Sequence, residues 1–598
     1  MRKQMRPILA IATACFRADP ARTIGSLAFR ILGMAGPVAY ATFLKEFVDA
    51  AGASDEGRLR VLAVWMALSV AALTACDRFG WQLGRILEEK TAHLIDREVI
   101  SLVAGLPGIE HHERAEHLDK IEHLRHEHWL LSMAVPALIS AAALWVQVMV
   151  TVAVLARVDA RLLALPVLAL PSVWAAARAE RIRYAYLDAA RPHWRTRDML
   201  VELATQPASA KELRVFGLRD EILRRHHDAC QFLIDGERDH RLAGAKLVLA
   251  ARLVFSAGYV LAILAVASRV GTGHTVGQVV LTVTLASQVM QQLAMAAGNV
   301  NWVAWTMTAV RRYVWLLDFA ESSRQALRRD APLVAVPPRL SDGIRFTGVR
   351  FAYPGTEHEV LHGVDLHVPA GSTLAIVGDN GAGKTTLVKL LTRMYEPSGG
   401  TITLDGVDLR DLDVEEWRQR TAAAFQDHAR LELIAQQAVG VGDVGRVDDE
   451  VAAIAALDRG GSLDVLDALP AGLQTQLGAA WDGGVDLSGG QWQRLAIGRA
   501  MMREQPLLLV LDEPTAALDA ETEHRLFTRY AEAAREAARA MGTVTILVSH
   551  RFSTVRMADE IVVVSGGRIA EHGSHADLMT RNGIYAELYE MQAAAYRS

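Results

Sequence analysis

The stretch from Gly378 to Thr386 has the residue types and spacing of a loop that binds phosphate. It reads Gly-Asp-Asn-Gly-Ala-Gly-Lys-Thr-Thr, which fits the pattern of Gly, four residues of any type, and then Gly-Lys-Thr. Glycines let backbone N–H groups approach phosphate oxygens, and a helix that starts here points its positive end at the same anion. The residues expected to bind a nucleotide are Gly378, Asp379, Asn380, Gly381, Ala382, Gly383, Lys384, Thr385 and Thr386.

Two carboxylates form a second chemical group. Asp512 and Glu513 follow the apolar run Leu507–Leu511. We expect Asp512 to hold Mg²⁺ together with the Thr385 hydroxyl, while Lys384 reaches the β- and γ-phosphates of ATP. Glu513 would then polarise the attacking water as general base. The alternative is a strand that ends in an ordinary acidic turn.

Both groups sit where an open α/β sheet carries its chemistry. Residues 373–377 read as a buried strand and 386–392 as the helix after the loop, while 506–511 read as another buried strand. Ligands bind such sheets at the carboxyl ends of the strands. A further strand is predicted over 343–351, and Tyr353 after it could stack on adenine or pack the strand end.

Length and composition indicate more than one domain. The chain has 598 residues, of which 51% are hydrophobic and 22% charged, so an apolar part is joined to an ordinary soluble part. The net charge of −5 is too mild to suggest a nucleic-acid partner. The three cysteines, at 15, 76 and 230, form no metal or redox motif, and no signal peptide is recognised.

Six apolar stretches before residue 311 predict membrane spans. Trp129–Ala156 and Thr275–Val310 contain no Asp, Glu, Lys or Arg over 28 and 36 residues. Both are longer than the roughly 18 residues that mark a spanning helix. The four weaker stretches are Thr23–Leu44, Val61–Cys76, Leu162–Ala177 and Leu247–Ser268. A soluble helical core accounts poorly for six such runs.

Six spans place both termini on one side, and the basic residues at the N-terminus indicate the cytosol. The inner connections, about 80–128 and 178–246, are long and charged. We expect both to be helical, with spans two to five continuing into the cytosol. The chain is thus predicted to be multi-pass in the cell (inner or plasma) membrane, with the C-terminal half and both termini cytosolic.

Each set of polar residues within the predicted spans has two possible structural roles. Arg30 and Arg252 could snorkel to the interface or line a path, and their positions favour snorkelling. Gln288, Gln292 and Asn299 fall near one face of the last span, with Gln291 and Asn301 flanking it. That face is expected to line a substrate cavity, with bonds to neighbouring helices as the alternative.

Residues 111–128 are rich in histidine. The six are His111, His112, His117, His123, His126 and His128. Their spacing fits no standard ligand set, and charged residues are interleaved. A solvated cytosolic helix is therefore expected rather than a metal site.

The sequence Leu487-Ser-Gly-Gly-Gln491 resembles the signature of ATP-binding cassette (ABC) transporters. Other stretches agree in order along the chain. They are Tyr353 at the aromatic-loop place, Gln426 at the glutamine-loop place, Ala517-Leu-Asp519 at the D-loop place and His550 at the switch-histidine place. The resemblance covers about residues 343–590. Six spans ahead of such a cassette look like an exporter-type half-transporter.

The resemblance implies an ATP site shared by two cassettes. One cassette supplies the phosphate loop, Asp512, Glu513 and His550, and Gln426 senses the γ-phosphate and contributes to the Mg²⁺ site. The opposite cassette supplies residues of the signature and the D-loop. These are Ser488, Gly489, Gly490, Gln491 and Asp519. Residues near 105–120 and 205–217 look like the regions that couple cassette to membrane helices.

One departure concerns the segment after Gln426. The Glu-Asn pair usual in relatives is missing, and Gln436, Gln437 and Ala438 stand in that neighbourhood. This puts the detail of coupling in doubt rather than ATP hydrolysis.

The expected fold is an α-helical six-span membrane domain followed by an α/β P-loop NTPase cassette with a helical subdomain. The expected parts are a cytosolic segment over 1–22, the membrane domain over 23–320, a linker over 321–341, the cassette over 342–590 and a tail over 591–598.

The expected function is ATP-driven export of an amphipathic solute, such as a drug, lipid, peptide or secondary metabolite. The cofactors are ATP and Mg²⁺, and the partners are the lipid bilayer, the substrate and a second copy of the chain. A heterodimer, an importer of a metal chelate and a regulatory ATP-binding protein that does not transport remain alternatives.

Overall fold

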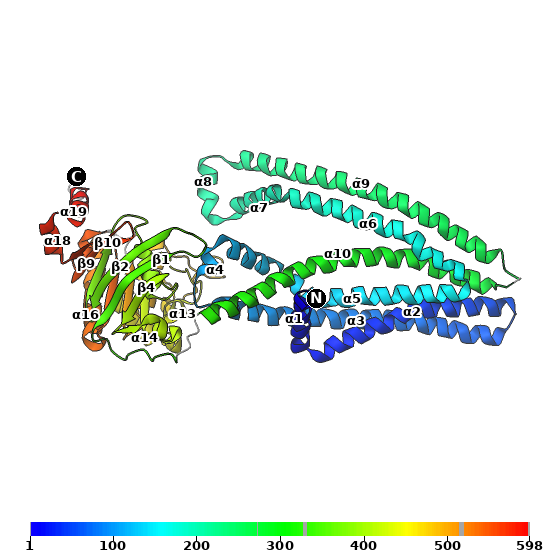
Figure 1. Cartoon of the computed structure of the whole chain (residues 1–598), viewed down its shortest axis with the longest axis horizontal. Helices are drawn as coiled ribbons and strands as arrows, with labels where there is room; N and C mark the ends of the chain where they lie inside the picture. Colours follow the sequence, from blue (N-terminus) through cyan, green and yellow to red (C-terminus); the bar gives the residue numbers. More distant parts are fainter. Residues whose placement is uncertain (1, 272, 327–331, 514–519, 550, 596–598) are drawn as a thin grey trace. The chain divides into compact units, whose positions relative to one another are not determined.

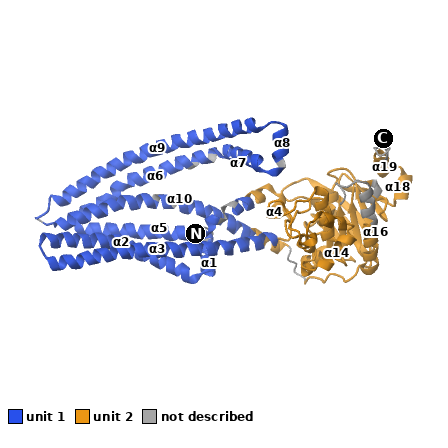
Figure 2. Ribbon diagram, turned by 180° about the vertical axis from the view of Figure 1, so that it is seen from behind, with its two compact units in different colours: residues 1–104, 120–318 blue, residues 105–119, 319–598 orange. Residues whose placement is uncertain are grey.

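The computed structural model describes residues 2–271, 273–326, 332–513, 520–549 and 551–595. They form two compact units (Figure 2). The first comprises Met1–Ala104 and Lys120–Asp318, and the second comprises Gly105–Asp119 and Phe319–Ser598. The short segment 105–119, which lies between two predicted spans, therefore groups with the cassette by its contacts.

The first unit is built from long helices (Figure 1). They are α1 (Arg2–Ala18), α2 (Pro20–Gly52), α3 (Glu56–Ala104), α5 (Ala115–Val158), α6 (Ala164–Ala189), α7 (Arg191–Thr205), α8 (Ala210–Val215), α9 (Arg219–Ala267) and α10 (Val276–Ala326). The 3₁₀ turns η1 (Ala160–Leu163) and η2 (Pro207–Ser209) precede α6 and α8. The predicted helical character of the two long inner connections is confirmed.

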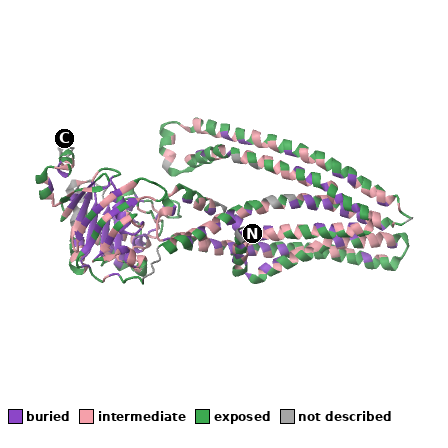
Figure 3. Cartoon of the chain, in the orientation of Figure 1, coloured by how far each residue is buried: buried purple, intermediate pink, exposed green. Residues whose placement is uncertain are grey.

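The prediction of six spans is also confirmed. Within the described residues, six helical segments are long and apolar enough to cross a membrane. They are Pro20–Gly52, Glu56–Ala104, Trp129–Val158, Ala160–Leu187, Arg219–Ala267 and Val276–Ala296. Only 6–44% of each apolar window is buried, so most of the residues in these windows are half-buried or exposed (Figure 3). Outward apolar surface suits lipid, where backbone groups must be satisfied within the helix itself.

The polar residues on one face of α10 lie in two different surroundings. Gln292 is buried, and its Nε2 donates a hydrogen bond of 3.3 Å to Oγ1 of Thr151 on α5. Asn299 lines a cavity of the first unit. The expected cavity face is therefore correct for Asn299, whereas Gln292 follows the helix-packing alternative. The side chain of Asn301 lies outside the described residues.

Arg30 departs from the snorkelling expectation. Its Nη1 donates a 2.7 Å hydrogen bond to Oγ of Ser140 on α5, and the side chain lines the same cavity as Asn299. A neighbouring helix offers the guanidinium a hydrogen-bond acceptor, so it lies among the helices. Arg252 on α9 is exposed, as snorkelling requires.

The histidine-rich segment is less solvated than expected. His111 and His117 are 3% and 7% exposed, and the His117 ring meets Phe319 at a centroid distance of 4.8 Å. Packing within the second unit therefore buries part of the segment. The side chains of His126 and His128 lie outside the described residues. In the described part of the chain, no three His, Cys, Asp or Glu side chains gather as metal ligands.

The second unit contains two sheets. The first is antiparallel in the order β2-β1-β4-β5, and the second has the order β10-β9-β3-β8-β7-β6, with parallel pairing from β9 to β6. Their strands are β1 (Gly343–Ala352), β2 (Glu359–Pro369), β3 (Thr373–Val377), β4 (Gly399–Leu404), β5 (Val407–Asp408), β6 (Thr421–Ala424), β7 (Leu508–Asp512), β8 (Val544–Val548), β9 (Glu560–Ser565) and β10 (Arg568–Gly573).

Helices surround these sheets. They are α4 (Glu110–Glu113), α11 (Lys384–Leu391), α12 (Val414–Gln419), α13 (Ala435–Gly440), α14 (Glu450–Arg459), α15 (Gly489–Ala500), α16 (Ala520–Met541), α17 (Phe552–Val555), α18 (His575–Arg581) and α19 (Ile584–Ala595). Short 3₁₀ turns connect several of them. They are η3 (Leu409–Asp411), η4 (Val444–Arg446), η5 (Leu463–Ala468) and η6 (Gly472–Gln474).

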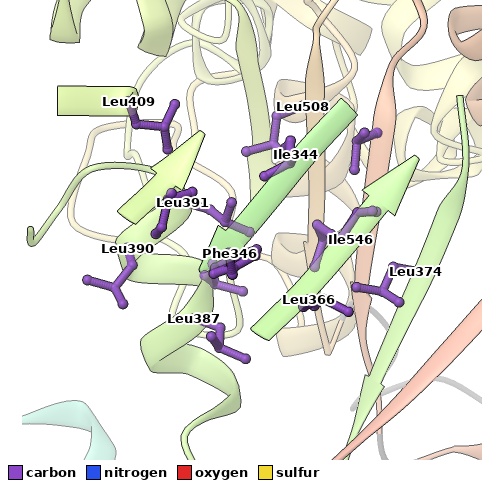
Figure 4. Packing of buried hydrophobic residues seen from close by; sticks show 14 of the residues in the cluster. Ile344, Phe346, Leu366, Leu374, Leu387, Leu390, Leu391, Leu409, Leu508 and Ile546 are labelled. Atoms are coloured by element: carbon purple, nitrogen blue, oxygen red, sulfur yellow. The ribbon is translucent and has the colours of Figure 1, made fainter. Parts of the chain in front are cut away.

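Two of the three hydrophobic cores described in the cassette hold its sheets and its helical subdomain together. In one, Phe346 of β1, Leu387 of α11 and Ile546 of β8 pack between the sheets and the helix after the loop (Figure 4). In the other, α13, α14 and α15 pack on β6 and β7. Burial of one such side chain contributes about 1.5–3 kcal/mol. The predicted α/β cassette with a helical subdomain is confirmed.

Candidate nucleotide site

The phosphate loop connects β3 to α11 through a backbone that requires glycine. Gly383 is the N-cap of α11 with φ of 108°, in the region that L side chains rarely adopt. At Gly378, with φ of 145°, a Cβ would lie 2.1 Å from the carbonyl oxygen of Val564 on β9. Neither position accepts a side chain, and the N-terminus of α11 is left open to an anion.

Lys384, the first residue of α11, has its ammonium group inside the loop. Its Nζ donates to the carbonyl oxygens of Gly378 at 2.8 Å and Asp379 at 2.9 Å, and the residue is only 6% exposed. Burial lowers its pKa, although the negative charge of Glu513 opposes the shift. A buried cation beside backbone N–H groups suits a ligand with several negative charges.

The two carboxylates lie at the end of β7 in different surroundings. Asp512 is 4% exposed, and burial together with the adjacent Glu513 raises its pKa to about 6. Glu513 has φ of 47°, and its N–H donates to the carbonyl oxygen of Val548 at 2.9 Å. A left-handed residue other than glycine costs about 1–3 kcal/mol, so the packing must hold Glu513 in this conformation.

Gln493 on α15 helps to keep Glu513 in this left-handed conformation. Its Nε2 donates a hydrogen bond of 3.1 Å to the carbonyl oxygen of Glu513. Gln493 stands two residues after the signature stretch, outside the residues predicted for the site. No sequence signal identified it, because its partner is a backbone carbonyl 20 residues away.

A cavity of about 580 Å³ joins the loop to the carboxylate end of β7. Its walls combine backbone and side chains from five parts of the cassette. They are Tyr353, Val360, Asn380, Gly381, Gly383, Lys384, Thr385, Thr386, Gln426 and Glu513. The structure therefore brings Tyr353, six of the nine predicted loop residues, Gln426 and Glu513 together around one cavity. Gly378, Asp379 and Ala382 belong to the same loop without lining this cavity.

The signature residues lie elsewhere. Ser488 is the N-cap of α15, where its Oγ accepts the N–H of Gln491 at 3.3 Å and its own N–H donates to Gln491 Oε1 at 2.8 Å. Among the residues described around the cavity, none comes from Ser488 to Gln491. Asp519 and His550 lie outside the described residues.

Tyr353 joins the cavity to an aromatic cluster. Its hydroxyl lies 3.1 Å from Oγ1 of Thr386, and its ring meets Phe351 and Tyr395 at centroid distances of 4.9 and 5.4 Å. The Nζ of Lys389 lies 5.3 Å from the ring centroid. Tyr353 thus packs the strand end and also borders the cavity, and its stacking on adenine stays a prediction.

Glu113 on α4 ties the segment 105–119 to this cluster. Its two carboxylate oxygens accept hydrogen bonds of 2.6 Å from Lys389 Nζ and from the Tyr395 hydroxyl. Burial lowers the pKa of Lys389, but the hydrogen bond to Glu113 together with the charge and hydrogen-bond interactions of Tyr353 and Glu113 outweighs burial, and the pKa is raised. Arg418 also donates to the carbonyl oxygen of Pro107. The sequence indicated the region but not these partners, because Glu113 and Lys389 are 276 residues apart.

We expect Glu113→Gln to weaken ATP binding about fivefold, equivalent to about 1 kcal/mol. Glutamine keeps the shape but loses the charge that holds Lys389 over Tyr353, and Tyr353 borders the cavity. Equilibrium binding of ATP to the purified chain measures the effect. Glu110→Gln is the matched control, because Glu110 lies on the same helix and pairs with Arg114. Equal ATP affinity in the two variants would rule out this role of Glu113.

The donor set fits a hard divalent cation. Thr385 and Gln426 line the cavity with a hydroxyl and an amide oxygen, and Asp512 lies directly before the cavity-lining Glu513. Oxygen ligands with adjacent carboxylates are those that Mg²⁺ prefers. With a pKa of about 6, the Asp512 carboxyl is mostly ionised at pH 7.

After the glutamine-loop residue, the chain forms part of the helical subdomain. Gln436 is buried in α13, and its Oε1 accepts a 2.7 Å hydrogen bond from Nε2 of Gln474. This residue of the unusual stretch therefore packs inside the cassette.

Comparisons with known proteins agree with this geometry. Residues 361–516 match the family model described as ABC transporter. Proteins named "ATP-dependent lipid A-core flippase" from Chromohalobacter salexigens and Ralstonia nicotianae are each 42% identical over 259 residues. Each match covers 43% of this chain and 42% of the relative, so the chain spans less than half the length of these relatives.

A solved structure extends the likeness to the whole fold. It is described as a bacterial Atm1-family ABC exporter with ATP bound, and the likeness covers 96% of this chain and 98% of that one. The TM-score is 0.75 and the sequence identity 23%, so the likeness concerns the fold. Residues 361–516 thus match the ABC transporter family model, and the chain as a whole shares the fold of this exporter.

Proposed function

We propose that the chain is an ATP-driven exporter of an amphipathic solute. The observation that carries the proposal is a phosphate loop and the Glu513 carboxylate around one cavity, in a chain that also has six apolar helices. A regulatory protein that only binds ATP needs no base in the position of Glu513. The relatives named as flippases act, by that name, on an amphipathic lipid, which supports this substrate class.

The cavity residues divide the work on ATP. Tyr353 stacks on adenine, and Lys384 with the loop N–H groups binds the β- and γ-phosphates. Thr385, Gln426 and Asp512 would hold Mg²⁺, which would neutralise phosphate charge. Glu513 orients the attacking water and takes its proton.

The site is completed by a second copy of the chain. Ser488 and its neighbours stand at the N-terminus of α15 but do not line the cavity of their own cassette. We propose that this helix end binds the γ-phosphate held by the opposite cassette, with Asp519 and His550 in their family roles. Both halves of the site occur in one chain, which favours a homodimer over a heterodimer.

The α8 region offers a surface for the same partner. Val215 and Phe216 are 80% and 68% exposed at its end. Exposed apolar side chains of this size indicate a contact surface. We propose that they dock on the cassette of the second copy and pass its motion to α7 and α9.

The proposed place is the cell membrane, with the cassette and both termini in the cytosol. ATP is a cytosolic ligand, and basic residues at the N-terminus favour the same side. An importer of a metal chelate with the same fold is the second candidate, and only the direction of transport separates the two.

The test uses proteoliposomes in which cassettes face outward, so that added ATP reaches them. A panel of amphiphiles, peptides and metal chelates is scored for ATPase stimulation and for movement across the bilayer. ATP-dependent accumulation of an amphiphile inside the vesicles, lost in Glu513→Gln, supports export. Movement only out of the vesicles supports import, and ATP binding without any turnover supports the regulatory alternative.

A further inference from the structure

A cavity of about 540 Å³ lies among α2, α3, α5 and α10 of the first unit, well apart in the chain from the nucleotide site. Charged and uncharged polar groups share its wall. They are Arg30, Asp77, Ser140, Gln147 and Asn299. Apolar side chains line the remainder, among them Met34, Leu73, Leu144 and Met295. A wall of this kind suits a ligand with a polar head and an apolar chain.

Arg30 is built into this wall. Its Nη1 bonds to Ser140 across the helices, and at Gly84 of α3 a Cβ would lie 3.3 Å from its Nη2. The glycine therefore gives the guanidinium room beside α3. The carboxylate of Glu88, further along α3, is held by Arg85 at 3.2 Å. Within the described residues, Arg30 forms a hydrogen bond to a neutral hydroxyl and no ion pair within 4 Å, although its charge also acts on the Glu88 carboxylate.

Asp77 places the opposite charge on the same wall. It comes from α3, whereas Arg30 comes from α2, and within the described part of the chain the two form no ion pair. Asp77 is exposed and directly follows the apolar stretch Val61–Cys76, whereas Arg30 is half-buried within the stretch Thr23–Leu44, where a charge is costly unless it is paired or hydrated. Two opposite charges that remain apart are each available to a ligand.

We propose that this cavity binds an amphiphile whose head carries both an anionic group and an ammonium group. Arg30 binds the anionic group through charge-assisted hydrogen bonds, and Asp77 binds the ammonium. Gln147 and Asn299 offer neutral hydrogen bonds, and the apolar wall receives the first part of the chain. The proposal rests on the proposed export function and specifies its substrate class as a zwitterionic amphiphile.

Four single-chain probes of equal acyl length test the charge pattern. They are a lysophosphatidylethanolamine, which is zwitterionic, a lysophosphatidic acid, an acyl trimethylammonium and a monoacylglycerol. Equilibrium binding is measured on the full-length chain in a neutral maltoside detergent, without ATP. We expect the zwitterion to bind about tenfold more tightly than the neutral probe, with the two single charges between them. Equal affinity for all four probes overturns the proposal.

Substitutions of the two charged residues are expected to change the affinities of the probes in opposite directions. Arg30→Gln is expected to weaken binding of the zwitterion and of the anion about tenfold. Binding of the cation should not be weakened. Asp77→Asn is expected to weaken the zwitterion but to strengthen the anion several-fold, because a repelling carboxylate is removed. A gain in affinity cannot come from misfolding. If Asp77→Asn weakens all probes alike, the assignment of Asp77 is wrong.

Two further measurements test where the probes bind and whether the acyl chain contributes to binding. Arg252→Gln, an exposed arginine on α9, is the matched control and should change none of the four affinities. Free phosphoethanolamine should bind far more weakly than the acylated form, and equal binding would overturn the role of the apolar wall. The assay needs neither ATP nor turnover, so an inactive ATPase refutes the proposed function without touching this result, and the converse also holds.

Discussion

Replacing Glu513 by glutamine is expected to lower ATP turnover by about 100-fold or more, while ATP still binds. Glutamine has nearly the same shape but cannot accept the proton of the attacking water. The backbone that positions residue 513 is unaffected by the change, since its N–H bonds to Val548 and its carbonyl to Gln493. ATP therefore still meets the loop and Lys384.

Steady-state phosphate release and equilibrium ATP binding, on the same preparation, measure the two parts of this effect. Glu532→Gln is the control, because Glu532 is exposed on α16 and away from the cavity-lining residues. Turnover by Glu513→Gln within a few-fold of the unaltered chain would show that another group acts as the base.

Lys384→Ala is expected to act on the earlier step and to weaken ATP binding itself by about 10- to 100-fold. Hydrogen bonds to charged groups are worth about 1.5–3 kcal/mol, and alanine leaves the phosphates without their buried cation. It also removes the bonds from Nζ to the carbonyl oxygens of Gly378 and Asp379, which hold the loop closed on itself.

Direct nucleotide binding at equilibrium distinguishes this variant from the loss of the base. Lys246→Ala, an exposed lysine of α9, serves as the control for loss of a positive charge. Unchanged ATP affinity after Lys384→Ala would refute the assignment of the loop as the phosphate site.

Local sequence patterns predicted most of the secondary structure and the candidate membrane spans. The strand predicted over residues 373–377 and the helix that follows the loop are β3 and α11, because the motif and its flanking apolar runs lie within 20 residues. The six apolar runs became the six candidate spans, because length and composition alone define that property. The strand predicted over 343–351 is β1, which ends at Ala352.

Contacts between distant residues could not be predicted in this way. Glu113 meets Lys389 and Tyr395 only because segment 105–119 packs on the cassette. Hydropathy places Arg30 within a span but does not say which face of the helix it occupies or that Ser140 accepts its hydrogen bond. The same limit applies to Gln292 and Asn299, whose shared face is split between packing and a cavity.

The signature residues show how far the nucleotide site itself was predicted. Ser488 is the N-cap of α15, so the signature lies at a helix start, and its role in the nucleotide site stays a prediction. Their distance from the loop cavity could not be read from the sequence, because the motif does not say which copy of the chain it serves. The proposed dimer explains why the signature residues do not line the loop cavity of their own cassette.

Crosslinking of Ser488→Cys on one chain to Asn380→Cys on another tests that dimer most directly. The background lacks Cys15, Cys76 and Cys230 and carries Glu513→Gln, so that bound ATP is retained. The two chains carry different tags, and each single-cysteine chain alone is the control. We expect a covalent product that contains both tags and forms only when ATP and Mg²⁺ are present. A product that forms equally without nucleotide, or no product with both tags while ATP is bound, would contradict the composite site.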